Sequence, residues 1–589
     1  MDFQGFYRGD VFDAYTFLGA HTEDDGTVFR TYAPAAKEIS VICECNGWQE
    51  SPMHRIYDGQ FWECRLQGAK AGEMYKYRVH QADGRVLDRA DPYGFYAQKR
   101  PESASVIVDL QQYTFHDAEW MAGRKVPAGA PFNIYEVHAG SWRRKKEWIQ
   151  GTDPADGWLN YRELADALIP YLVKYHYTHV ELMPLAEYPS DESWGYQGTG
   201  FYAATSRYGS PDDLKYLIDR CHQSGIGVLL DVVMVHFAVN DYGLWDFDGT
   251  PLYSYPHPAV GYSEWGSCNF IHSRGDVRSF LQSSCLFWLK EYHFDGLRFD
   301  AVSNLIFWQG DANRGENKDA IAFLQHMNAG LKKREPTAVL IAEDSTVYGK
   351  TTAPVSAGGL GFDYKWNMGW MNDTLSFLEK DQRERRDAYS MLTHTFDYAF
   401  TEHFVLPISH DEVVHGKHPV AEKMNGFPAD RLRQMRMFYL YMYVYPGAKL
   451  DFMGNELGED REWDEKRELD WRILEDPPHR DYAAFRAALH AFYQQHSALW
   501  EDDRKTGFAW IDREDAPDLI IAFERRSRGE RLLCLFNFSD HDEEYDLPYS
   551  LADEELELLF ESSQGLPDPS TRGTVFLGAY SGKVYRIDR

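Results

Sequence analysis

Eight short apolar runs alternate with helix-like segments through the middle of this chain. The runs span residues 133–138, 179–184, 227–235, 296–302, 339–344, 362–366, 404–409 and 448–453. One helix start is clear at Ser210-Pro211, because serine caps helices well and proline fits the first helical position. Eight strands that alternate with helices favour a (β/α)8 TIM barrel over an open doubly wound sheet. No GxGxxG or P-loop sequence opens any of these helices, which argues against a nucleotide-binding fold.

Strand-rich segments flank this barrel pattern on both sides. Residues 15–115 contain short alternating strands separated by Gly and Pro turns, a pattern typical of a β-sandwich. From about Lys505 the chain returns to short strands, predicted at 519–523, 531–538 and 574–586. We therefore predict a multidomain protein, with an N-terminal β-sandwich over residues 1–118, a (β/α)8 barrel over 119–500 and a C-terminal all-β sandwich over 501–589.

Composition narrows the class of partner. The net charge is −31 and the pI is about 5.1, which argues against nucleic acid or an anionic membrane, because both bind clustered Lys and Arg. Aromatic residues make up 15% of the chain, and flat rings stack on sugar faces, so they weakly favour carbohydrate. The N-terminus lacks the features of a signal peptide, and no apolar run is long enough to span a membrane. We expect a cytoplasmic monomer with a neutral substrate.

Charged residues follow or end four of the predicted barrel strands. They are Asp231 and His236 after the third strand, Arg298 and Asp300 in the fourth, Glu343 after the fifth, and His410 and Asp411 after the seventh. A period of two would place Arg298 and Asp300 on one strand face, where buried charges are costly unless they pair or do chemistry. Taken alone, that pair is equally consistent with a structural ion pair. Since catalytic groups of such barrels lie at the carboxyl ends of strands, four charged ends predict a carboxylate-rich pocket.

The strand order makes Asp300 and Glu343 neighbours. Adjacent strands lie about 4.8 Å apart, and a retaining glycosidase holds its two carboxyl groups roughly 5–5.5 Å apart, one as nucleophile and one as acid/base. Arg298 beside Asp300 would keep that carboxylate ionised, as a nucleophile requires. Glu343 would need a raised pKa to hold a proton near neutral pH, which a closed aromatic pocket would supply.

A metal ion is the competing use of clustered acids and histidines. No HExxH motif or Asp-rich loop of recognisable metal spacing is present. The seven cysteines are scattered and never form a CxxC pair. Cys43 and Cys45 alternate within a predicted strand, and we interpret them as small apolar residues. We therefore expect no metal and no cofactor.

Four segments resemble the signature regions of the alpha-amylase superfamily, in the same order. They are Asp231–His236, Gly296–Val302, Ala342–Ser345 and His410-Asp411. Segments 193–197, 206–209, 362–370 and 409–417 resemble the glycogen (1,4-alpha-glucan) branching enzymes of that superfamily. The resemblance covers about residues 15–589. It implies a retaining double displacement on α-1,4-glucan, as in amylose or glycogen, that forms an α-1,6 branch without a cofactor.

The resemblance also implies roles for individual residues. Asp300 matches the nucleophile, Glu343 the general acid/base and Asp411 a third carboxylate that holds the distorted sugar. Arg298 matches the residue that orients the nucleophile. The positions that match sugar-binding residues at the cleavage subsite are Tyr196, Asp231, His236 and His410.

The chain departs from the family patterns at three places. Val235 stands where many amylases carry an asparagine that ligates a structural calcium, so we expect no calcium there. Residues 232–234 differ from the Trp-Val-Pro run that is more common in branching enzymes, which affects the shape of the pocket more than its chemistry. One predicted sandwich precedes the barrel, where some bacterial branching enzymes have two.

Two other functions stay open at this stage. A hydrolase of similar layout, such as a trehalose-releasing maltooligosyl hydrolase, would use the same three carboxylates. The runs 365–370 and 413–417 favour branching. A catalytically silent glucan-binding protein is disfavoured because Asp300, Glu343 and Asp411 are all present.

Overall fold

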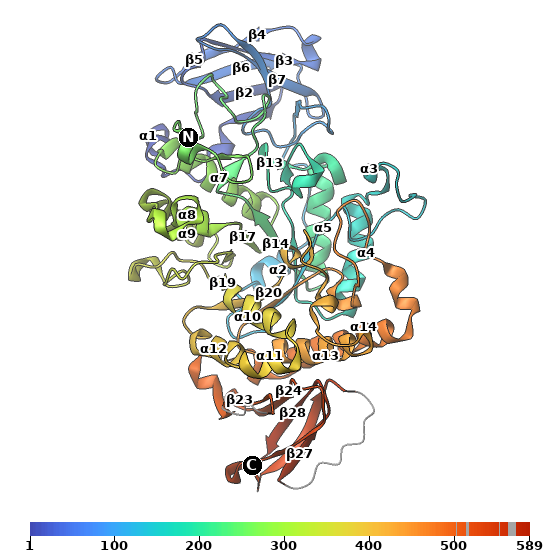
Figure 1. Cartoon of the computed structure of the whole chain (residues 1–589). Coiled ribbons are helices and arrows are strands. Elements are labelled where there is room, and N and C mark those ends of the chain that lie inside the picture. Colours follow the sequence, from blue (N-terminus) through green and yellow to red (C-terminus); the bar gives the residue numbers. More distant parts are fainter. Residues whose placement is uncertain (502–503, 514–517, 553, 564–572, 589) are drawn as a thin grey trace. The chain divides into compact units, whose positions relative to one another are not determined.

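The structure is a computed structural model that describes residues 1–501, 504–513, 518–552, 554–563 and 573–588 (Figure 1). Its internal contacts form two compact units. The first comprises residues 1–125, 138–169 and 181–363, and the second comprises 126–137, 170–180 and 364–589. Among the described residues, no helix has both the length and the apolar character needed to cross a membrane.

The first unit begins with two antiparallel sheets, drawn in blue in Figure 1. One sheet has the strand order β1-β2-β6-β5, and the other has the order β4-β3-β7-β8 with β9 paired to β7. Their bounds are β1 Gly19–Glu23, β2 Gly26–Tyr32, β3 Glu38–Cys43, β4 Ser51–Pro52, β5 His54–Ile56, β6 Phe61–Gln67, β7 Met74–His80, β8 Val86–Arg89 and β9 Ser105–Val106. Phe29 of β2 and Tyr75 of β7 meet with ring centroids 4.8 Å apart, so the two sheets share a core. The predicted N-terminal β-sandwich is confirmed.

The turn after β3 differs from the sequence prediction. The sequence predicts Cys43 and Cys45 in one strand, but β3 ends at Cys43 and Cys45 lies in the 3-10 turn η2, Glu44–Asn46. The backbone N–H of Cys43 donates to Oδ1 of Asn46 at 3.2 Å, and Gly47 follows with φ +67°. The Asn46 side chain thus closes the turn and ends the strand, which a pattern of alternating residues does not reveal.

A buried arginine joins the sandwich to a barrel loop of the same unit. Arg89, at the end of β8, is buried, and its guanidinium donates to the carbonyl oxygens of Trp245 at 3.0 Å and Asp246 at 2.6 Å. Burial lowers the pKa of Arg89 to about 10, so the group is still a cation at neutral pH. Asp248 of the same loop accepts a hydrogen bond from the backbone N–H of Ala35 at 2.9 Å. These bonds seat the sandwich on the loop.

Eight parallel strands close into a barrel in the order β10-β11-β14-β17-β18-β19-β20-β21. Their bounds are β10 Asn133–Val137, β11 His179–Leu182, β14 Gly227–Val232, β17 Gly296–Phe299, β18 Val339–Ala342, β19 Tyr364–Trp366, β20 Phe404–Ile408 and β21 Ala448–Phe452. Each lies within one of the predicted apolar runs, because barrel strands are buried on both faces. Loops hold the strand pairs β12 Ala186–Glu187 with β13 Gly200–Ala204, and β15 His236–Phe237 with β16 Cys268–Asn269. The predicted (β/α)8 barrel is confirmed.

The fourth barrel strand, β17, is shorter than predicted and ends at Phe299. Ala301 has φ +48°, a left-handed conformation that ends extended backbone. Helix α8, Val302–Ile306, begins at the next residue. Asp300 therefore lies just beyond the strand, and the prediction that one strand continues through Val302 is wrong. The side chains of Arg298 and Asp300 still meet, as predicted.

Helices alternate with the barrel strands as predicted, except between β18 and β19, where the only helical element is the 3-10 turn η7, Val355–Ala357. The longer ones are α4 Tyr161–Lys174, α5 Pro211–Gln223, α7 Gly275–Glu291, α9 Lys318–Arg334, α10 Met368–Leu378, α12 Ser390–Tyr398, α13 Pro428–Val444 and α14 Pro477–Gln495. The shorter ones are α1 Phe3–Arg8, α2 Ala118–Gly123, α3 Pro154–Gly157, α6 Pro258–Gly261, α8, α11 Gln382–Asp387 and α15 Tyr549–Ala552. Helix α5 has the predicted cap, because Oγ of Ser210 accepts from the backbone N–H of Asp213 at 3.2 Å and Oδ2 of Asp213 accepts from that of Ser210 at 3.0 Å.

The C-terminal part of the second unit is all-β. A five-stranded sheet has the order β22-β23-β24-β28-β26, and β25 pairs with β27. Their bounds are β22 Phe508–Asp512, β23 Ile520–Arg526, β24 Arg531–Asn537, β25 Glu543–Asp546, β26 Glu555–Glu561, β27 Thr574–Leu577 and β28 Ser581–Asp588. The two sheets share one apolar core, and helix α13 packs against β24 and β28 (Figure 1).

This C-terminal region confirms the predicted all-β sandwich and corrects one of its strands. The segment 574–586, predicted as one strand, forms β27 and β28, because Tyr580 takes φ +49° between them. A left-handed residue reverses the chain locally, so a continuous strand cannot pass through it. The predicted domain limits at residues 118 and 500 stay predictions.

Candidate active site

The register of three neighbouring barrel strands sets the site in the first unit. Strand β14 pairs with β17 so that Asp231 lies opposite Arg298, and β17 pairs with β18 so that Phe299 lies opposite Ala342. The backbone N–H of Glu343 donates to the carbonyl of Phe299 at 3.0 Å. Asp300 and Glu343 therefore directly follow the carboxyl ends of adjacent strands, where barrel enzymes carry their catalytic groups.

The guanidinium of Arg298 connects three carboxylates. Nη1 donates to Oδ2 of Asp231 at 2.7 Å and to Oδ1 of Asp300 at 2.8 Å, and Nη2 lies 3.8 Å from Oε2 of Glu343. The Arg298 side chain is 1% exposed, against 17% for Asp300 and 16% for Glu343. Burial disfavours the cation, but Asp231 and the other acidic groups outweigh it, so the pKa of Arg298 lies well above its ordinary value. A fixed positive charge therefore lies beneath two carboxylates that solvent reaches.

Glu343 is positioned by a strained stretch of backbone. Ala301 has φ +48°, which is unfavourable for a residue with a Cβ. In this conformation its N–H donates to Oε2 of Glu343 at 2.6 Å. The carbonyl of Glu343 in turn accepts from the N–H of Val302 at 2.9 Å. The turn that ends β17 thus holds Glu343 by both its side chain and its main chain.

Two further predicted residues lie in loops of the first unit. The hydroxyl of Tyr196 donates to Oδ2 of Asp231 at 2.6 Å, on the same oxygen that Arg298 contacts. His236, in β15, is buried, and its ring centroid lies 5.1 Å from that of Trp265. Burial lowers the pKa of His236 to about 4, so its imidazole is neutral at neutral pH. A neutral imidazole can donate one hydrogen bond and accept another, which suits sugar hydroxyls.

The second unit holds the other two predicted residues, at the end of β20. Nδ1 of His410 lies 2.6 Å from Oε1 of Glu136, and the His410 backbone N–H donates to Oε2 of Glu136 at 3.1 Å. Nε2 of His410 lies 3.5 Å from Oδ1 of Asp411. The side chain of Asp411 is 53% exposed, whereas those of Glu136 and His410 are buried. Glu136 therefore fixes His410 through the ring atom Nδ1 and the backbone N–H. The other ring nitrogen, Nε2, faces the exposed Asp411 carboxylate.

The structure places six of the eight predicted site residues in the first unit and two in the second. Five of them form one connected group in the first unit: Tyr196, Asp231, Arg298, Asp300 and Glu343. His236 packs beside Trp265 in the same unit, and His410 contacts Asp411 in the second.

Sequence reasoning missed two contributors to this site, Glu136 and the backbone of Ala301. Glu136 had a usable signal, because it is a lone charge in the apolar strand β10 and a buried carboxylate needs partners. No sequence signal marks Ala301, because alanine seldom adopts a left-handed conformation and tertiary contacts impose it here.

Known families match three segments of the chain. Carbohydrate-binding module 48 (isoamylase N-terminal domain) matches residues 17–94, the alpha amylase catalytic domain matches 164–243, and the alpha amylase C-terminal all-beta domain matches 510–586. The 1,4-alpha-glucan branching enzyme GlgB of Fusobacterium nucleatum subsp. nucleatum is 41% identical over 98% of this chain and 92% of its own length. The 1,4-alpha-glucan branching enzyme GlgB of Bacillus caldolyticus is 42% identical over 91% and 81% respectively.

Solved structures share the fold at lower identity. A pullulanase from Anoxybacillus sp. LM18-11, complexed with maltotetraose, superimposes with a TM-score of 0.77 at 18% identity, covering 99% of this chain and 89% of the pullulanase. The apo pullulanase from Paenibacillus barengoltzii has a TM-score of 0.77 at 20% identity and covers 99% and 95%. At such identities the likeness shows the fold alone.

The buried environment of His236 leads to a pH prediction. Because burial lowers its pKa from 6.5 to about 4, we expect the imidazole to stay neutral as pH falls through 6.5. The folded state then binds fewer protons than the unfolded state, so His236 lowers the stability by up to about 3 kcal/mol as pH falls from 6.5 to 4. Nitrogen-detected NMR measures the protonation of the imidazole as a function of pH. The His236 resonance is assigned by its loss in His236→Gln. A titration midpoint at or above 6.5 would contradict the assignment.

Proposed function

The chain belongs to the family of 1,4-alpha-glucan branching enzymes, and we propose that it cuts an α-1,4 linkage and transfers the released chain to a 6-hydroxyl. The product is an α-1,6 branch, as in glycogen biosynthesis. The named relatives extend over nearly the whole chain, and the match to carbohydrate-binding module 48 supports an α-glucan as donor and acceptor. The observation that carries the chemistry is the Arg298 guanidinium, hydrogen-bonded to Asp300 and 3.8 Å from Glu343.

The first chemical step would form a covalent glycosyl-enzyme. Asp300, whose ionised form is favoured by the hydrogen bond from Arg298, attacks the anomeric carbon of the glucan. Glu343 gives its proton to the glycosidic oxygen as the bond to carbon breaks. The reducing-end fragment leaves, and the other fragment stays attached to Asp300 as an ester.

The second step would transfer that fragment to an acceptor glucan. Glu343, now ionised, takes the proton of a 6-hydroxyl, and the hydroxyl oxygen attacks the anomeric carbon and displaces the Asp300 carboxylate. Two inversions at one carbon give net retention. The carboxylates perform both the covalent and the proton-transfer work, so this route uses no cofactor.

The remaining residues would hold the sugar at the cleavage subsite. We assign hydroxyl contacts to Asp411 and His410, with Glu136 as a positioning residue that fixes the tautomer of His410. Tyr196 would stack beneath the sugar ring while its hydroxyl stays bonded to Asp231. Strengthening of such contacts as the ring distorts lowers the barrier of glycoside cleavage.

Amylose distinguishes branching from hydrolysis. Iodine colour reports the length of linear chains, and reducing ends report net cleavage by water. We expect the purified chain to lower the iodine colour of amylose with no matching rise in reducing ends. Isoamylolytic debranching of the product should then release new short chains. A rise in reducing ends that parallels the loss of colour would identify a hydrolase and overturn the proposal.

Substitution of the three carboxylates tests the assigned roles. We expect Asp300→Asn, Glu343→Gln and Asp411→Asn each to lower turnover by about a thousandfold or more, with far-UV circular dichroism unchanged. Asp319→Asn is the matched control, since Asp319 lies on α9 with a side chain that is 61% exposed. Near-normal turnover in any of the three variants would remove that residue from the mechanism.

A further inference from the structure

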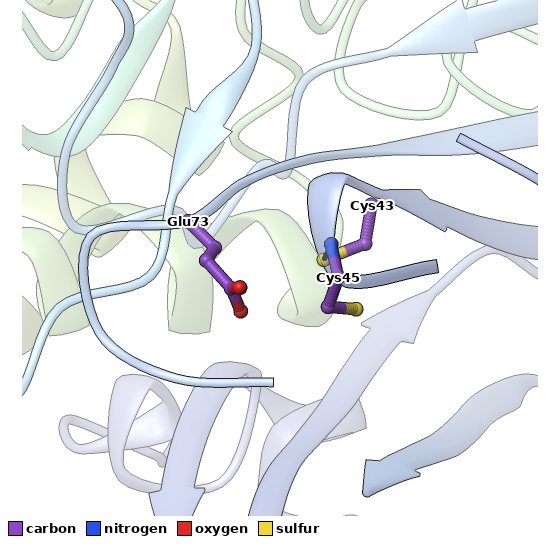
Figure 2. A group of neighbouring side chains, drawn as sticks. All are labelled: Cys43, Cys45 and Glu73. Atoms are coloured by element: carbon purple, nitrogen blue, oxygen red, sulfur yellow. Dashed lines mark hydrogen bonds between the residues drawn. The ribbon is translucent and has the colours of Figure 1, made fainter. Parts of the chain in front are cut away.

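Three donor atoms converge at one edge of the N-terminal sandwich. Among the described residues, Cys43, Cys45 and Glu73 each offer one ligand atom, and these atoms all lie within 4.8 Å of one another. Figure 2 shows the two cysteines on a single turn and Glu73 on the neighbouring loop. Cys43 is buried, and the other two side chains are partly exposed. The group is therefore reachable from solvent on one side.

Strand pairing brings Glu73 to the cysteine turn. Strands β3 and β7 are antiparallel, and Cys43 pairs with Tyr75, the second residue of β7. Beyond that pair, Oε2 of Glu44 accepts a hydrogen bond from the backbone N–H of Met74 at 2.9 Å. Glu73 immediately precedes Met74, in the loop before β7. The pairing of β3 with β7 therefore places the Glu73 carboxylate next to the cysteine turn.

The turn itself directs both sulfur atoms to one place. Cys43 is the N-cap of η2, and its Sγ accepts a hydrogen bond from the backbone N–H of Cys45 at 3.3 Å. Oδ1 of Asn46 accepts from the backbone N–H of Cys43 at 3.2 Å. These bonds curl the backbone around the Cys43 thiol, so that Cys45 stays beside it. In the strand predicted from the sequence, the two thiols would simply be two residues apart on one face.

We propose that Cys43, Cys45 and Glu73 form a binding site for a thiophilic divalent transition metal of the Zn²⁺ class. Two thiolates and a carboxylate are donors that Zn²⁺ takes in proteins, and thiolates select against Mg²⁺ and Ca²⁺. Three protein donors leave one position of a tetrahedral ion to water. The bound ion would tie the turn after β3 to the loop before β7 and so stabilise this edge of the sandwich.

Protonation makes the binding depend on pH. A cysteine binds a metal ion as the thiolate, so the ion must displace the thiol protons to bind. Affinity should rise with pH, and binding should release protons into a weakly buffered solution.

Cobalt titration of the reduced full-length chain tests the site. Co²⁺ bound to thiolate gives a sulfur-to-metal charge-transfer band in the near ultraviolet, which carboxylate sites do not give. We expect one equivalent of Co²⁺ per chain with this band, and its displacement by Zn²⁺. Cys45→Ala should lose the band and the bound equivalent. Cys534→Ala is the control, because it also removes one thiol, but from a buried position in β24 of the other unit.

Glu73→Gln keeps both cysteines and tests the carboxylate separately. This variant should bind Co²⁺ more weakly than the wild type while retaining the charge-transfer band. It tests the site even if Cys45→Ala fails to fold. Cys64 is a poor control, because its thiol interacts electrostatically with Cys45 of the site. The proposal is overturned if the wild type binds no more Co²⁺ than Cys45→Ala. It is equally overturned if mass spectrometry of untreated protein shows a Cys43–Cys45 disulfide and the reduced protein takes up no metal.

Discussion

The ion pair network of Arg298 is the interaction on which the rest of the site depends. A guanidinium that is 1% exposed needs compensating charge, and Asp231 and Asp300 supply it at 2.7 and 2.8 Å. That contact requires β14 and β17 to pair in one register, with Asp231 opposite Arg298. A shift of one residue in this register would separate Arg298 from Asp231 and bury an unpaired cation. The ion pair therefore favours the observed register.

The network also explains why β17 stops where it does. The left-handed conformation of Ala301 ends the strand and directs the Ala301 N–H to the Glu343 carboxylate. The local backbone cost, about 1–3 kcal/mol for such a conformation, is borne at the residue that orders the second carboxylate. The backbone strain therefore lies at the peptide that binds the proposed acid/base Glu343, while the strands around it are regular.

Much of the fold was accessible from the sequence, because its determinants are local. Apolar runs located all eight barrel strands, and Ser210 with Asp213 marked the start of α5 through a capping pair three residues apart. The features that the sequence did not reveal depend on contacts between residues that are not part of a local pattern. The turn that removes Cys45 from β3 and the contact of Glu136 with His410 depend on partners that the linear pattern does not specify. The charges at the strand ends were visible, but their hydrogen-bond partners were not.

In the proposed mechanism Asp300, held by Arg298, becomes covalently attached to the sugar. The direct measurement is intact-protein and peptide mass spectrometry of Glu343→Gln incubated with an α-maltosyl fluoride. Fluoride leaves without a proton donor, but the second step lacks its base, so the intermediate should accumulate. We expect a maltosyl adduct on the peptide that contains Asp300, and no adduct in the double variant Asp300→Asn, Glu343→Gln. An adduct on another residue, or turnover of the fluoride with inversion and no adduct, would contradict it.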